Sequence, residues 1–154
     1  MKALVVYDSV HGNTEKIAQA IGKAIAKEIE VVVKRANEVK TEQLKDIELV
    51  IIGSPTHGGW FTEAVKEFLN NTMKLLKQDI RIAVFDTRTP PVLIHKVFGY
   101  AANKMKKTLI KQRREIVVEP EGFLVEGLKE PLSEGEEERA EKWGKSIIEN
   151  QKNS

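Results

Sequence analysis

The chain of 154 residues contains no cysteine. Disulfide bonds, cysteine-ligated zinc or iron–sulfur clusters and thiol nucleophiles are therefore excluded, and the composition fits a cytoplasmic protein. A large excess of charge is missing as well: the net charge is only +2, so no strongly charged partner such as nucleic acid is implied. Long hydrophobic runs are also lacking. We expect neither a signal peptide nor a membrane-spanning segment.

Short apolar runs alternate along the chain with segments of helical periodicity. The continuously apolar core of segment 2–7 predicts a strand covered on both faces, as in a parallel sheet. The expected strands are 2–7, 29–34, 49–53, 80–86 and a fifth formed by 116–118 with 123–125. A helix is expected after each strand. This alternation predicts one doubly wound α/β domain over residues 1–149, with helices on both faces of a parallel sheet and a polar tail at 150–154.

Local signals predict where several helices begin. Asn13 and Thr62 are placed to cap the helices that follow the first and third strands. Ser133 and Glu136 form a capping-box pattern before the last helix. Apolar residues recur every fourth position through 92–112, and this spacing predicts one long helix there.

The loop after the first expected strand has the composition of an anion site. It comprises Ser9, Val10, His11, Gly12, Asn13 and Thr14. Ligands of doubly wound sheets bind beyond the carboxyl ends of the strands, where this loop lies. Its hydroxyls and its flexible glycine precede a helix whose first N–H groups lack intrahelical partners, so a phosphate can bind without a lysine. A tight turn that only caps the helix is the alternative, and these residues leave both interpretations open.

The loop after the third expected strand offers surfaces for ring stacking. It comprises Pro55, Thr56, His57, Gly58, Gly59 and Trp60. Paired glycines let the backbone approach a flat ligand closely, and the Trp60 and His57 rings can stack on one. The alternative is that Trp60 folds back onto the domain, which is the commoner arrangement for a loop tryptophan taken alone. An anion loop and a stacking loop at one edge of a sheet together favour a nucleotide-like ligand.

These two loops resemble those of the flavodoxins. The segment SVHGNT is similar to the family's phosphate loop, with His11 as the departure and a possible phosphate donor, and GSPTHGGW is similar to its second flavin loop. The segments FDTR, EGFLVEG and PLSEGEEERAEKWG further resemble a less-studied group of flavodoxin-domain proteins. The resemblance covers nearly the whole chain. It implies a short-chain flavodoxin-like sheet of order 2-1-3-4-5 and FMN as the cofactor, with its phosphate at 9–14 and its ring at 55–60.

The loop after the fourth expected strand, DTRTPP, departs from the flavodoxin pattern. Flavodoxins place a tyrosine or tryptophan here against the outer face of the flavin, whereas this loop has no aromatic residue and its prolines lack backbone donors. The resemblance implies that Asp86, Thr87 and Arg88 belong to the FMN site, with Arg88 over the ring or at its pyrimidine edge. A local ion pair between Asp86 and Arg88 is the alternative, and both interpretations stay open at this point.

Other polar residues carry less information. The basic cluster at 104–107 and 111–114 is either a solvated helix face or a docking site for an acidic redox partner. Nucleic acid binding is not expected, because aromatic residues are not interleaved with these charges. The histidines are not spaced as metal ligands, and His95 is expected to be packed or solvated.

The favoured hypothesis is an FMN-binding electron carrier with a redox partner protein of unknown identity, as a monomer or weak homodimer. The near-neutral charge and Arg88 predict a second reduction potential above that of acidic flavodoxins. An FMN-dependent NAD(P)H:quinone-type oxidoreductase is the alternative, since the third loop leaves the outer ring face open. A flavin-free binding or regulatory module of the same fold is the second alternative.

Overall fold

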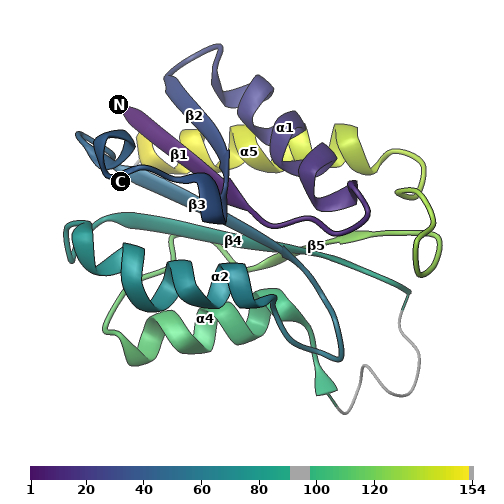
Figure 1. Cartoon of the computed structure of the whole chain (residues 1–154). Coiled ribbons are helices and arrows are strands. Elements are labelled where there is room, and N and C mark those ends of the chain that lie inside the picture. Colours follow the sequence, from purple (N-terminus) through teal and green to yellow (C-terminus); the bar gives the residue numbers. More distant parts are fainter. Residues whose placement is uncertain (91–97, 153–154) are drawn as a thin grey trace.

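Five parallel strands form the central sheet, in the order β2-β1-β3-β4-β5 (Figure 1). They are β1 (Lys2–Tyr7), β2 (Glu30–Arg35), β3 (Leu49–Pro55), β4 (Arg81–Arg88) and β5 (Glu121–Leu124). The computed structural model describes residues 1–90 and 98–152, without the side chains of 151 and 152. The predicted fold class and strand order are confirmed.

Helices cover both faces of this sheet (Figure 1). One face packs against α1 (Asn13–Ile25) and α5 (Glu136–Lys152), and the other against α2 (Glu63–Glu67) and α4 (Ala101–Lys111). A π-helical turn (Phe68–Thr72) and a 3-10 turn (Met73–Leu75) prolong α2, and two 3-10 turns (Ala36–Glu38 and Thr41–Leu44) lie between β2 and β3.

The central strands are buried from both sides. All seven residues of β3 are buried, and Ala3, Leu4, Val5 and Val6 of β1 have no exposed surface. Odd positions of β1 contact the α1–α5 side and even positions the α2–α4 side, because side chains alternate along a strand. Each fully buried aliphatic side chain contributes about 1.5–3 kcal/mol by leaving water. The sheet is thus a rigid base for the loops at its carboxyl edge.

The predicted cap of α1 was wrong. Gly12, in the left-handed region at φ 91°, precedes the helix, and the Asn13 side chain instead donates to the Glu130 carbonyl at 2.8 Å. The Ser9 hydroxyl takes the capping role, since it accepts from the N–H groups of Gly12 at 3.1 Å and Glu15 at 3.2 Å. The Asn13 side chain therefore makes a tertiary contact with the loop at Glu130 instead of capping its own helix.

The other two predicted caps also lack side-chain capping bonds. Thr62 does precede α2, but its buried hydroxyl has no hydrogen-bond partner within the described part of the chain. The Glu136 carboxylate accepts from the N–H of Leu124 at 2.7 Å and from Arg139, so it does not turn back to Ser133. Glu136 thereby joins the start of α5 to β5, and the predicted capping box was wrong.

The long helix predicted over 92–112 is interrupted. Gly99 has a φ of 78° and Tyr100 is extended, so α4 begins only at Ala101. Its predicted first part, His95 included, falls within residues 91–97, outside the described residues. The fifth strand is shorter than predicted as well: segment 116–118 contributes only a bridge between Ile116 and Ile82.

Candidate functional site

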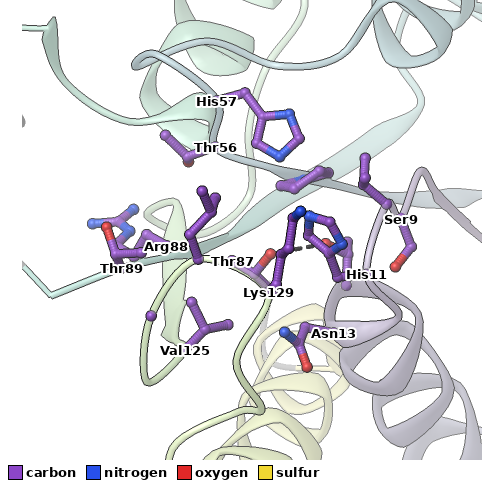
Figure 2. Close-up of a pocket in the computed structure, with 15 residues that line it drawn as sticks. Ser9, His11, Asn13, Thr56, His57, Thr87, Arg88, Thr89, Val125 and Lys129 are labelled. Carbon is purple, nitrogen blue, oxygen red and sulfur yellow. Dashed lines mark hydrogen bonds between the residues drawn. The ribbon is translucent and has the colours of Figure 1, made fainter.

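A pocket that is open to solvent lies at the carboxyl edge of the sheet (Figure 2). The loops after β1, β3 and β4 meet there, as expected for parallel strands. Ten of the predicted site residues line it: Ser9, Val10, His11, Asn13, Thr14, Pro55, Thr56, His57, Thr87 and Arg88. Five predicted residues do not: Gly12, Gly58, Gly59, Trp60 and Asp86.

The first loop is held in place from β2. Arg35 donates from Nη1 to the Ser9 carbonyl at 3.1 Å and from Nη2 to the Glu15 carboxylate at 2.8 Å. With the Ser9 hydroxyl capping two N–H groups, the backbone N–H groups of His11, Asn13 and Thr14 have no acceptor among the described residues. Donors of this kind at the N-terminus of a helix favour an anion.

A hydroxyl pair joins the first and third loops. The Oγ1 atoms of Thr14 and Thr87 lie 2.8 Å apart, in a hydrogen bond that either residue can donate. Both side chains are buried at the floor of the pocket. The bond fixes the start of α1 against the end of β4.

Asp86 and Arg88 form the local ion pair that was one of the two open interpretations. Arg88 donates from Nε at 2.7 Å and from Nη2 at 2.8 Å to the two oxygens of the fully buried Asp86 carboxylate. The N–H of Ala102 donates to Asp86 Oδ2 at 2.9 Å. Burial raises the pKa of Asp86, while the bonds from Arg88, Ala102 and Thr56 act to lower it.

Arg88 lies over an aromatic ring of the protein itself. Its guanidinium carbon is 3.6 Å from the centre of the Tyr100 ring, a cation–π contact. Sequence reasoning missed Tyr100 because it fell inside the predicted long helix. Arg88 still lines the pocket, so its contact with a bound ring stays a prediction. Its charge is largely compensated by Asp86, which weakens the argument for a raised reduction potential.

The second loop turns tightly beside the pocket. His57 and Trp60 exchange two backbone hydrogen bonds of 3.0 Å around Gly58 and Gly59, whose φ angles of 58° and 78° suit glycine. The Trp60 ring stacks on Phe61 with 5.1 Å between ring centres. It therefore folds onto the domain with 48% of its surface exposed, and Pro55, Thr56 and His57 form this wall of the pocket.

A further wall comes from the loop after β5, which sequence reasoning did not assign to the site. Val125, Gly127, Leu128 and Lys129 line the pocket, together with Thr89. The parallel order of the sheet was the available signal, because the carboxyl end of β5 lies next to that of β4.

Neither a metal site nor a membrane span is found within residues 1–90 and 98–152. There, no three histidine, aspartate or glutamate side chains gather as a metal would require. No helix in those ranges combines the length and apolar character needed to cross a bilayer.

Fold and pocket together define a doubly wound α/β protein with an open pocket at the carboxyl edge of its sheet, where such proteins bind their ligands. The chain belongs to the flavodoxin domain family, whose model matches residues 4–118. Comparison with curated protein sequences finds no significant match.

Solved flavodoxins are similar to this chain over nearly their full length. A flavodoxin from the domain Archaea shares 25% identity at a TM-score of 0.81, with 99% of both chains covered. Flavodoxin 2 from Bacillus cereus shares 24% identity at a TM-score of 0.77, with 97% of this chain and 99% of that one covered. The chain is also similar in fold to 36% of rubredoxin oxygen:oxidoreductase from Desulfovibrio gigas, at 19% identity, 99% coverage of this chain and a TM-score of 0.78.

Proposed function

We propose that this protein binds FMN at the pocket and carries electrons between partner proteins. The observation that carries the proposal is that the N–H groups of His11, Asn13 and Thr14, at the N-terminus of α1, have no acceptor in the part of the chain that the structure describes, while the same three residues line the pocket. Membership of the flavodoxin domain family supports the same ligand.

The residues present fit FMN. A phosphate dianion matches backbone N–H donors and hydroxyls in a wall that contains no carboxylate among its described residues. Pro55, Val10 and Val125 supply apolar surface for a ring. FMN, when bound, supplies reversible one- and two-electron chemistry, and the protein contributes its binding, orientation and electrostatics.

Each loop then has a distinct task. Residues 9–14 hold the phosphate, with His11 as an added donor. Pro55, Thr56 and His57 flank the ring, and the Gly58–Gly59 peptide beside them can reorient at small cost because neither residue has a side chain. Thr87 and Arg88 lie towards the pyrimidine edge of the flavin. Asp86 does not line the pocket but holds the Arg88 side chain in place through their ion pair.

An FMN-dependent NAD(P)H:quinone-type oxidoreductase is the second candidate. Trp60 lies outside the pocket wall and Tyr100 is engaged with Arg88. With neither aromatic side chain covering it, the outer face of the flavin ring would be open to a nicotinamide or a quinone. The protein would then be an enzyme, with a small-molecule partner in place of a protein.

Two measurements separate these functions. Titration of the purified protein into FMN, followed by flavin fluorescence, is expected to show quenching with a micromolar or lower Kd, and weaker binding of riboflavin. The loaded protein is then mixed with NADPH and a quinone. Slow oxidation of NADPH supports the carrier, and sustained turnover supports the oxidoreductase. No quenching at tens of micromolar FMN would contradict both and leave the flavin-free module.

A further inference from the structure

Lys129 enters the pocket from the loop after β5. Lys129 lines the pocket together with His11, Asn13 and Thr14 of the first loop, and Figure 2 shows its side chain among the residues of that pocket. Its ammonium group has no hydrogen bond or ion pair with any described residue. A lysine at the anion loop is not required by the loop itself, which binds through backbone N–H groups.

The backbone of Lys129 is held in an unusual conformation. Its φ of 65° lies in the left-handed region, which is uncommon for a lysine. Three bonds fix the loop around it: the N–H of Glu130 donates to the Gly127 carbonyl at 3.0 Å, the N–H of Glu126 to the Pro131 carbonyl at 2.8 Å, and Asn13 to the Glu130 carbonyl at 2.8 Å. The last bond ties Lys129's neighbour to the anion loop.

The charges around the pocket favour a role for this lysine. Of the basic side chains that line it, Arg88 is paired with Asp86, and His11 and His57 are imidazoles. Among the described residues that line the pocket, Lys129 thus carries the permanent positive charge that no carboxylate neutralises. Its exposed neighbours Glu126 and Glu130 neither line the pocket nor pair with it.

We propose that Lys129 is a specificity-determining residue whose ammonium group pairs with the FMN phosphate on the side opposite α1. This inference rests on the proposed function. It assigns the loop after β5 to phosphate recognition and makes the site select the phosphorylated flavin over riboflavin by charge as well as by backbone donors. Asn13 acts as a positioning residue, because its bond to Glu130 holds the lysine's loop against the phosphate loop.

Lys129→Asn tests the proposal, because asparagine tolerates a positive φ and lacks the charge. FMN Kd is expected to rise about tenfold, the typical effect of losing one charge-assisted contact, and riboflavin Kd to stay unchanged. The salt dependence of FMN binding should weaken, and the stability of the unliganded protein should not fall. Lys129→Arg, which keeps the charge, should bind FMN within about twofold of the parent chain.

Arg113→Asn is the matched control. Arg113 is also basic, exposed and at a positive φ of 61°, but it follows α4 at the opposite edge of the sheet. Equal FMN affinities for the two asparagine variants would overturn the role of Lys129 while leaving FMN binding intact. A parallel loss of riboflavin affinity would show a structural role and also overturn it. If the parent chain binds no FMN, the proposed function fails, and this inference with it.

Discussion

Asp86→Asn is expected to destabilise the protein strongly. The substitution keeps the shape of the side chain and removes the charge that holds Arg88. Asp86 is fully buried, whereas the Arg88 side chain is 19% exposed and can regain only part of its hydration. Removal of one partner of a buried pair typically costs about 3–5 kcal/mol, and the partial exposure of Arg88 places this site near about 3 kcal/mol.

Urea denaturation followed by circular dichroism measures this cost as a fall in the free energy of unfolding. In a thermal scan, a change of about 3 kcal/mol corresponds to a loss of about 6–12 °C in Tm for a chain of this size. Glu119→Gln is the control, because Glu119 pairs with Lys106 at 3.2 Å with 89% of its side chain exposed. An exposed pair is worth at most about 1 kcal/mol.

The double variant Asp86→Asn/Arg88→Gln separates the ion pair from other effects. If the pair carries the cost, the double variant is less destabilised than the sum of the single variants by about 1–3 kcal/mol. A single Asp86→Asn variant within about 1 kcal/mol of the parent, or strict additivity, would refute the argument that the buried pair organises the third loop.

Two further substitutions test the packing and the electrostatics. Gly53→Ala would place a methyl group against the Phe85 ring, which already contacts Gly53, so the free energy of unfolding should fall by about 1–3 kcal/mol in a thermal scan. Unchanged stability would contradict this close packing. Glu136→Gln tests a pH dependence. The bond from Arg139 holds the pKa of Glu136 below its ordinary value of 4.5. The ionised carboxylate therefore stabilises the fold above pH 4.5, and this contribution is lost as pH falls through the lowered pKa. Urea denaturation should therefore find the parent chain more stable than Glu136→Gln by about 1–2 kcal/mol at neutral pH, with the gap closing on acidification below pH 4; a gap that does not change with pH would show that the carboxylate charge contributes nothing.

Local patterns in the sequence were sufficient to predict the fold class, a parallel sheet with helices on both faces, whereas the strand order was implied by the family resemblance. The strands β1 and β3 are continuously apolar because helices cover both of their faces, and a parallel sheet requires crossovers that the helical segments provide. The carboxyl edge of such a sheet then places the loops after β1, β3 and β4 together, whatever their exact contacts. Those two facts account for the ten predicted residues that line the pocket.

Contacts between distant residues could not be predicted in this way. The bond from Asn13 to Glu130 spans 117 positions, and it decides that Asn13 does not cap α1. The same contact brings Lys129 to the site, which no motif near residue 129 indicates. Trp60 had two interpretations in the sequence, with packing on the domain favoured for the residue alone, and in the structure its ring stacks on Phe61 beside the turn at Gly58 and Gly59.

The break between 92 and 112 illustrates a different limit. Apolar residues at helical spacing continue through the segment, but Gly99 adopts a positive φ that helices do not contain. Tyr100 is thereby released from the helix and lies under Arg88. Periodicity alone could not distinguish this arrangement from an uninterrupted helix.

The central claim is that the N–H groups at the start of α1 bind the phosphate of FMN. A nuclear magnetic resonance titration of the isotope-labelled protein with FMN tests it most directly. We expect the largest amide shift changes at His11, Asn13 and Thr14, and none at Arg113 on the opposite edge. Riboflavin should leave the three first-loop amides almost unchanged. Amides of the first loop that do not respond to saturating FMN, or that respond equally to riboflavin, would contradict the account.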